Sequence, residues 1–311
     1  MRMLVGLGLL GACGRGDDAV PAPTPTVDVA QHPPLLFQVF GDATDPRVVP
    51  VATIAGGKLD RIIVPVSALH ALDSAYFSAG TRYPIFRDGM SAGMLTIRRP
   101  MWLPDSEPLY TLPGCKDVMP MGAATLDATV PIESAVEFLA TSAPPASRAP
   151  VTLPSAAEAL RRGRALALEA AKAEGLEAVD LDSLFFYAKW IATRPGKPAS
   201  LYAVFLDQNG GDIGAGQGHS SSVMVIADDT GAGYQLTYRS IHSGEVKSVE
   251  YRRLLNQLDV DGDGIDELVA EAWRFGSSSD LVILGWRTGA WRELLRVPQR
   301  WCATPEKPAK R

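Results

Sequence analysis

The chain has 311 residues, of which 46% are hydrophobic and 21% are charged, and its formal net charge at pH 7 is −5. This length and apolar content suffice for one or two domains with buried cores, which excludes a disordered or collagen-like chain. The charged residues are spread along the chain without long runs of one sign. We therefore expect no nucleic acid partner.

The start of the chain resembles the signal sequence of a bacterial lipoprotein. A single arginine is followed by an apolar run at residues 4–10, and small residues precede Cys13. The apolar run is too short to span a bilayer as a mature helix. The resemblance implies a signal peptide over residues 1–12 and a lipid anchor on Cys13. The protein would then be membrane-anchored in the cell envelope, at the outer membrane or facing the periplasm; the alternative is a chance cysteine.

Two further cysteines, Cys115 and Cys302, remain if Cys13 carries lipid. An even pair in an oxidising compartment favours a disulfide between them. The alternative is two free thiols, which alkylation and mass measurement of the unreduced protein would reveal.

Proline-rich stretches divide the rest of the chain, because their composition favours extended backbone and buries no core. The organisation that we expect is a tether at 13–34, an N-terminal β domain at 35–141, a linker at 142–154, a helix at 155–175, a C-terminal β domain at 183–300 and a tail at 301–311.

The N-terminal domain is expected to be a small β-barrel or β-sandwich. Short β-type runs occur at residues 37–40, 49–54 and 61–66. Two more runs flank Asp88 and Gly89, and an Asp-Gly pair between alternating apolar residues predicts a hairpin, because glycine supplies the positive φ of the turn. Residues 132–140 are predicted to form a helix.

The next helix has recognisable ends. Ser155 and Glu158 have the spacing of a capping box, in which each side chain accepts from an otherwise unpaired backbone amide. Gly175 is suited to the position after the last helical turn. An apolar stripe between these ends predicts a helix that packs on a sheet.

The C-terminal domain contains an internal repeat. Leu206-Asp207 matches Leu258-Asp259 at an offset of 52, and Thr230-Gly-Ala matches Thr288-Gly-Ala at an offset of 58. Ser-rich segments at 220–222 and 277–279 match between them, and both units are rich in β-type runs. We therefore predict a mainly β (α+β) fold whose C-terminal half consists of two tandem β-meander units in packed antiparallel sheets, with the helix or the first domain over an edge.

Tryptophans of this half are expected mostly to fill its core, although some could instead form a sugar-stacking surface. They are Trp190, Trp273, Trp286 and Trp291.

An acidic segment in the second unit, residues 259–267, has the pattern of a calcium loop, and we call it the Asp-rich loop. Asp259, Asp261 and Asp263 occupy positions one, three and five, where their charges would repel one another without a hard cation between them. Gly264 allows a sharp bend, after which Ile265 offers its carbonyl and Glu267 a carboxylate. The alternative is an acidic turn that holds no metal.

The Asp-rich loop is not an EF-hand, because position twelve is Ala270 and the residues that follow the loop read as a strand. It resembles instead the loop of FG-GAP/VCBS repeats, found in integrin-like propellers and in bacterial extracytoplasmic proteins. That resemblance implies Ca²⁺ held by Asp259, Asp261, Asp263 and Glu267, although the family usually has Asp at the last position. Two units are too few to close a propeller.

The expected function is therefore that of a non-catalytic, calcium-stabilised lipoprotein that binds an envelope protein or glycan. The alternative is an extracytoplasmic hydrolase acting on polysaccharide or cell-wall material. Its candidate residues are His219 beside Ser220, His242, and the pair Asp228 and Asp229. These residues show no established catalytic spacing, and neighbours on a strand point to opposite faces.

Overall fold

The computed structural model describes residues 32–101, 120–132, 136–143, 145, 148, 151–177, 181–207, 218–276 and 279–299. This part of the chain is mainly β, with a closed six-stranded barrel and two further antiparallel sheets. The prediction of a mainly β fold with two C-terminal meanders is confirmed. The three cysteines lie outside the described residues, so the lipid anchor and the disulfide stay predictions.

The N-terminal domain is the barrel. Six strands run in the order β1-β7-β4-β5-β6-β2, and a further pairing of β1 with β2 closes the ring. A short β3 extends from β2 as a hairpin. The strands are β1 (Leu35–Asp42), β2 (Asp45–Ala55), β3 (Lys58–Arg61), β4 (Arg82–Arg87), β5 (Met90–Met101), β6 (Met121–Ala128) and β7 (Val136–Thr141).

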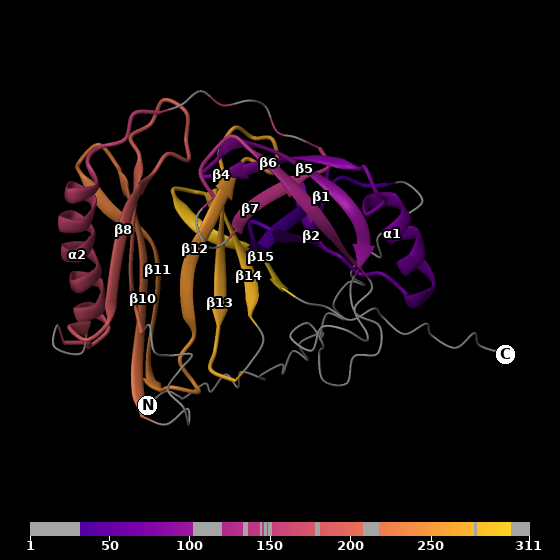
Figure 1. Ribbon diagram of the computed structural model, residues 1–311. Helices are drawn as coiled ribbons and strands as arrows, with labels where there is room; N and C mark the ends of the chain where they lie inside the picture. The colour runs from indigo at the N-terminus through magenta and orange to yellow at the C-terminus, as the bar shows by residue number, and fades with distance from the viewer. Residues whose placement is uncertain are drawn as a thin grey trace, which may run out of the picture.

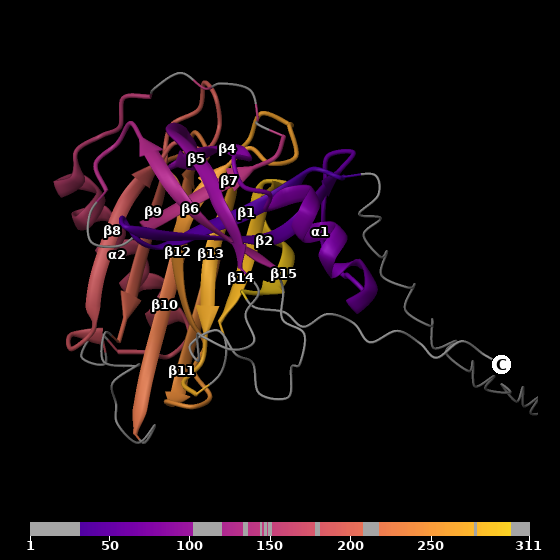
Figure 2. The ribbon, with the colours of Figure 1, turned by 45° about the vertical axis from the view of Figure 1, so that its right-hand side comes forward.

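Apolar side chains that alternate along these strands fill the barrel, as Phe37 and Val39 do from β1 and Ile85 does from β4. Helix α1 (Leu69–Tyr76), which follows a 3-10 turn at Val66–Ala68, adds apolar side chains to the same core. Figure 1 and Figure 2 show α1 beside the barrel, on the side away from α2 and the first sheet.

The predicted hairpin at Asp88 and Gly89 is confirmed, since it joins β4 to β5 and both residues have positive φ, 52° and 74°. The predicted helix at 132–140 is wrong, because this segment ends in strand β7. Val136, Phe138 and Ala140 enter the barrel core while Leu139 faces outward. Pairing with β1 and β4 on both sides selects the two-residue period over a helical one.

The C-terminal domain consists of two four-stranded meanders. The first contains β8 (Phe185–Ile191), β9 (Ser200–Leu206), β10 (His219–Asp229) and β11 (Tyr234–Glu245). The second contains β12 (Tyr251–Leu258), β13 (Glu267–Trp273), β14 (Asp280–Arg287) and β15 (Ala290–Pro298). Their facing sides share one core, in which Tyr202 and Met224 of the first sheet meet Leu268 and Val282 of the second.

The strand connections of the two meanders confirm one part of the predicted internal repeat and correct another. The Thr230 and Thr288 hairpins are equivalent, because each joins the third strand of its sheet to the fourth. The Asp207 segment joins the second and third strands of its sheet, whereas the Asp-rich loop joins the first and second. Residues 220–222 lie within β10 rather than in a turn. The loop match at offset 52 therefore relates positions that are not equivalent.

The layers lie in the order α2, first sheet, second sheet, barrel (Figure 1). Helix α2 (Ala156–Ala173) has the predicted ends, with Ser155 Oγ accepting from Glu158 N and Gly175 at φ 85°. It packs closely on the first sheet, where a Cβ on Gly163 would lie 2.7 Å from that of Ala188.

The outer face of the second sheet packs on the outside of the barrel. Val269 and Ile283 from this face share an apolar core with Leu36, Phe86 and Leu139 of the barrel. The helix and the barrel thus cover faces of the two sheets rather than an edge, which corrects the expectation. The two inner strands of the second sheet, β13 and β14, are consequently buried over most of their length, whereas Arg292 and Glu293 of β15 are exposed.

The tryptophans serve packing as expected. Trp291 is 1% exposed and Trp190 is 5% exposed. Trp273 stacks on Tyr251, and Trp286 makes an edge contact with Trp291.

Candidate metal site and adjacent pocket

The Asp-rich loop connects β12 to β13 and is folded by its own carboxylates. Asp259 accepts hydrogen bonds from the backbone N–H groups of Gly262 at 2.8 Å and Gly264 at 3.0 Å. Asp261 accepts from Asp263 N at 3.1 Å. Both glycines have positive φ, 80° and 85°, which an L side chain rarely adopts. The predicted tight bend is therefore present.

Three carboxylates of the loop converge. One oxygen each from Asp259, Asp261 and Glu267 lie within 4.8 Å of one another, so this acidic triad could hold a metal ion. Two oxygens on opposite sides of a calcium ion are about 4.6–5.2 Å apart, because each Ca–O distance is about 2.3–2.6 Å. The spacing of the triad thus fits a cation of that size.

Within the acidic triad, Glu267 gives the strongest indication of a bound cation. It begins β13, is fully buried, and accepts from Val260 N through Oε2 at 3.0 Å. The backbone N–H of Asp261 gives the carboxylate a further, weaker contact. Oε1 is buried without a hydrogen-bond partner. A buried carboxylate oxygen beside two other carboxylates has an incomplete environment that a cation would complete.

Burial also raises the pKa of two carboxyl groups of the triad. It raises the pKa of Glu267 to about 8, and the charges of Asp261 and Asp263 act in the same direction. The pKa of Asp259 is raised as well, first by burial. Burial and the neighbouring carboxylates therefore both disfavour the charged form of Glu267 and Asp259, which a bound cation would favour.

Of the two other predicted ligands, the structure places Asp263 outside this triad. Asp263 accepts from Ile265 N through Oδ1 at 2.8 Å and lies outside the group of close oxygens. The side chain of Ile265 packs between the two sheets, and its carbonyl as a ligand stays a prediction.

Sequence reasoning missed Arg287, the last residue of β14. Its Nη2 donates to Asp261 Oδ2 at 3.0 Å, and its Nη1 lies 3.6 Å from Asp263 Oδ2. The guanidinium partly neutralises the loop. Nothing in the spacing of the sequence relates this residue to the loop, because sheet pairing alone brings it there.

The Asp-rich loop lies against both nearby hairpins of the barrel. A Cβ on Gly57, in the β2–β3 turn, would be 3.2 Å from Asp261 O. A Cβ on Gly89, in the β4–β5 turn, would be 2.3 Å from Asp266 Oδ2. The second hairpin is also bonded to β12, since Asp88 N donates to Asn256 Oδ1 at 2.8 Å. The loop is thus part of the junction between barrel and second sheet.

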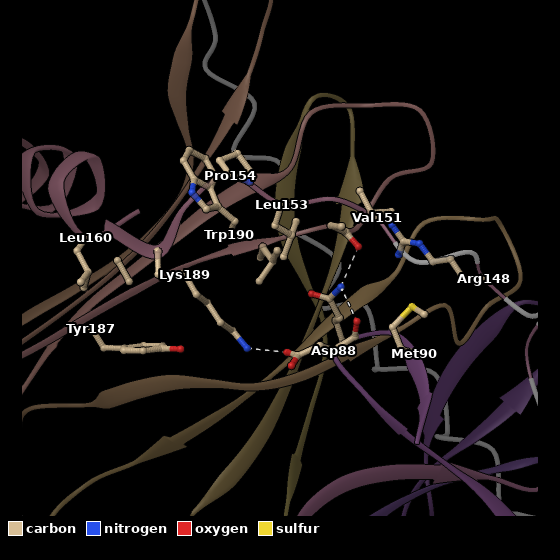
Figure 3. A pocket seen from close by; sticks show the side chains of 15 residues that line it. Asp88, Met90, Arg148, Val151, Leu153, Pro154, Leu160, Tyr187, Lys189 and Trp190 are labelled. Atoms are coloured by element: carbon tan, nitrogen blue, oxygen red, sulfur yellow. Dashed lines mark hydrogen bonds and ion pairs between the residues drawn. The ribbon is translucent and has the colours of Figure 1, made fainter. Parts of the chain in front are cut away.

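A pocket of about 470 Å³ lies beside this junction (Figure 3). Its walls come from the β4–β5 turn, the chain before α2, the first turns of α2, and β8. Most of the lining is apolar, including Leu153 and Trp190. The polar lining residues are Asp88, Arg148, Lys189 and Gln257, with Tyr187 presenting its hydroxyl.

Among the candidate residues of the hydrolase alternative, Asp228 has a structural role. Asp228 is 1% exposed and accepts from Arg194, Ser200, Thr237 and Trp291, so its oxygens are saturated.

Ser220 Oγ donates to Asp207 Oδ2 at 2.9 Å, while its neighbour His219 is exposed. His242 Nε2 lies 3.1 Å from Ser240 Oγ, and Asp229 caps Gly231 N. His242 thus lies beside a serine hydroxyl, that of Ser240, and none of these contacts joins two of the candidate residues.

Within the described residues, neither helix has the length and apolar character needed to cross a membrane. A comparison with known proteins finds no family model, no curated protein and no solved structure that matches this chain.

Proposed function

We propose that this protein is a non-catalytic binding module of the cell envelope whose β structure is stabilised by Ca²⁺ in the Asp-rich loop. The observation that supports this most is the buried, unpartnered Oε1 of Glu267 beside Asp259 and Asp261. The lipid anchor on Cys13 and the kinship with FG-GAP/VCBS loops belong to the same proposal and rest on the sequence.

Calcium fits this donor set better than other common cations. The triad offers only carboxylate oxygens, whereas zinc prefers nitrogen and sulfur ligands. Magnesium requires shorter distances, about 2.0–2.1 Å, in near-ideal octahedral geometry. Ca²⁺ accepts 6–8 oxygen ligands at longer and more variable distances, so Asp263, the Ile265 carbonyl or water would complete its shell.

The role of the ion would be structural. Glu267 opens β13, whose next residues are buried on both faces, and Val260 in the loop packs with the barrel. A cation that joins Glu267 to Asp259 and Asp261 would fasten the start of this central strand and the adjoining barrel contact. Bound Ca²⁺ stabilises the folded state by about 2.7 kcal/mol when its concentration is 100 times the Kd.

Thermal unfolding of the full chain in Ca²⁺, in Mg²⁺ and in EDTA tests the metal. We expect Ca²⁺ to raise the Tm by about 5–10 °C over EDTA, given about 2–4 °C per kcal/mol for a chain of this size. Asp261→Asn should abolish the gain, because the amide keeps the acceptor for Asp263 N but loses the charge.

The matched control is Asp229→Asn, which alters a similar turn-capping carboxylate outside the loop and should keep the full response. Equal melting curves in Ca²⁺ and EDTA, or equal responses of the two variants, would refute the metal site. Separately, mass spectrometry of the membrane fraction should find acylated Cys13, and Cys13→Ser should release the protein from that fraction.

A further inference from the structure

Gln257 lines the pocket beside the barrel junction and has a buried acceptor without a partner. Gln257 is 2% exposed, and its Nε2 donates to Ala192 O at 2.9 Å and to Asp266 Oδ2 at 3.0 Å. Because both partners are acceptors, the orientation of the amide is fixed. Its Oε1 is then left buried without a hydrogen bond.

An unpartnered donor lies at the same end of the pocket. Arg148 Nη1 bonds to Asp266 Oδ2 at 2.5 Å, the same oxygen to which Gln257 donates. Arg148 Nη2 is buried and has no partner. Both side chains contact the same oxygen of Asp266, so they lie at the same end of the pocket. Buried polar atoms of this kind normally bind protein, water or a ligand.

The charges around the pocket cancel in pairs. Lys189 Nζ contacts Asp88 Oδ1 at 2.6 Å, as the dashed line in Figure 3 shows, and Arg148 is paired with Asp266. An anion or a cation entering the pocket would have to break one of these pairs. The arrangement thus favours an uncharged ligand.

The rest of the lining is apolar and open to solvent. Four large apolar or aromatic side chains there are more than a third exposed: Val151 at 47%, Leu153 at 43%, Leu160 at 42% and Tyr187 at 43%. Figure 3 shows them around a common space. A volume of about 470 Å³ lies within the range of small-molecule sites, which are mostly apolar with a few placed polar groups.

From these features we infer that the pocket binds a small uncharged ligand with an apolar body and a carboxamide group. The amide N–H donates to Gln257 Oε1, and the amide oxygen accepts from Arg148 Nη2. The apolar body covers Leu153, Leu160 and Tyr187. This inference does not depend on the metal, because its polar pair comes from residues outside the acidic triad.

Calorimetry on the full chain tests the inference with a matched series of probes, in EDTA and in Ca²⁺. The series is 3-phenylpropanamide, 3-phenylpropanoate, 3-phenylpropylammonium and n-butylbenzene. We expect the amide to bind with a Kd of about 1 mM or lower and at least about tenfold more tightly than the other three. Equal affinity for all four, or no binding of the amide, overturns the inference.

Substitutions locate the site. Arg148→Lys keeps a cation for Asp266 but removes the second donor, so amide affinity should fall about tenfold, whereas affinity for n-butylbenzene should not change. Leu153→Trp fills the pocket from an exposed position and should block every probe. The control is Arg162→Lys, on the exposed face of α2 and outside the lining, which should bind the amide normally.

Crystals soaked with the amide give an independent outcome. Density for the amide between Gln257 and Arg148 supports the inference, and an ordered water that bridges them in its place overturns it. Binding of a capped apolar peptide along the free edge of β8, with no binding of the amide, would also overturn it, because the occupant would then be a strand.

Discussion

Replacing Glu267 with Gln should change stability with opposite sign in the two states of the Asp-rich loop. Without metal, the native carboxylate is fully buried and its Oε1 has no partner. With a pKa raised to about 8 by burial, the group is mostly protonated at pH 7, and an unsatisfied buried polar atom costs about 1–3 kcal/mol. Gln keeps an acceptor for Val260 N and offers a donor to Asp259 and Asp261, whose oxygens lie within 4.8 Å.

In EDTA we therefore expect Glu267→Gln to be more stable than the native protein by about 1–3 kcal/mol, or about 2–12 °C in Tm. In Ca²⁺ the native protein should gain stability and the variant should not, because a neutral amide is a poor replacement for a carboxylate ligand. Thermal and urea unfolding, followed by circular dichroism in both buffers, measure the difference.

A control on the same strand is Glu271→Gln. Glu271 is partly exposed and pairs with Arg253 at 2.8 Å, so its loss should lower stability slightly in both buffers and leave the calcium response intact. A Glu267→Gln variant that melts below the native protein in EDTA would refute the argument that the buried, unpartnered carboxyl is costly. A variant that keeps the full calcium gain would show that Glu267 is not a ligand.

Three further predictions test the surroundings of the loop. Arg287→Met removes the guanidinium that contacts the loop carboxylates, so calorimetry should show Ca²⁺ binding about fivefold more tightly, equivalent to about 1 kcal/mol. Unchanged affinity would mean that the Arg287 guanidinium does not compete with Ca²⁺ for these carboxylates. Burial opposes ionisation of Glu250, but hydrogen bonds from Arg296 and Arg252 lower the pKa of this carboxyl from 4.5 to about 2. The ionised Glu250 contributes up to about 3 kcal/mol to the free energy of unfolding above pH 4.5, and this contribution is lost as the pH falls toward 2. The stability of Glu250→Gln, measured by acid unfolding, should therefore depend less on pH between 4.5 and 2 than that of the native protein. Gly89→Ala places a Cβ 2.3 Å from a buried carboxylate oxygen at φ 74° and should lower the free energy of unfolding in urea by about 2–4 kcal/mol. Gly56→Ala, also at positive φ but with open space around it, should lower it by about 1 kcal/mol. Equal losses would mean that the junction between barrel and second sheet shifts to accommodate the added Cβ.

Local patterns in the sequence were sufficient for several elements. The Asp88-Gly89 turn, the capped helix from Ser155 and the tight Asp-rich loop each depend on backbone preferences of residues that are neighbours in the chain. The spacing of Asp259, Asp261 and Glu267 was likewise enough to place their oxygens together, because the loop is folded by its own hydrogen bonds.

The helix predicted at 132–140 failed for a nonlocal reason. Its residues alternate between the barrel core and the second core, and only pairing with β1 and β4 makes that alternation visible. The repeat was read correctly at the Thr230 and Thr288 hairpins and incorrectly at the loops, because sequence similarity does not report which strands a loop connects.

What the sequence by itself determined is thus the β character of this protein and an acidic loop able to hold a cation. Only the tertiary structure brought Arg287 to that loop, and only it placed Arg148 and Gln257 on one oxygen of Asp266. These contacts join residues more than 20 positions apart in two cases, 26 for Arg287 with Asp261 and 118 for Arg148 with Asp266. Sheet register and the packing of the layers decide such distances, and neither leaves a local signal in the chain.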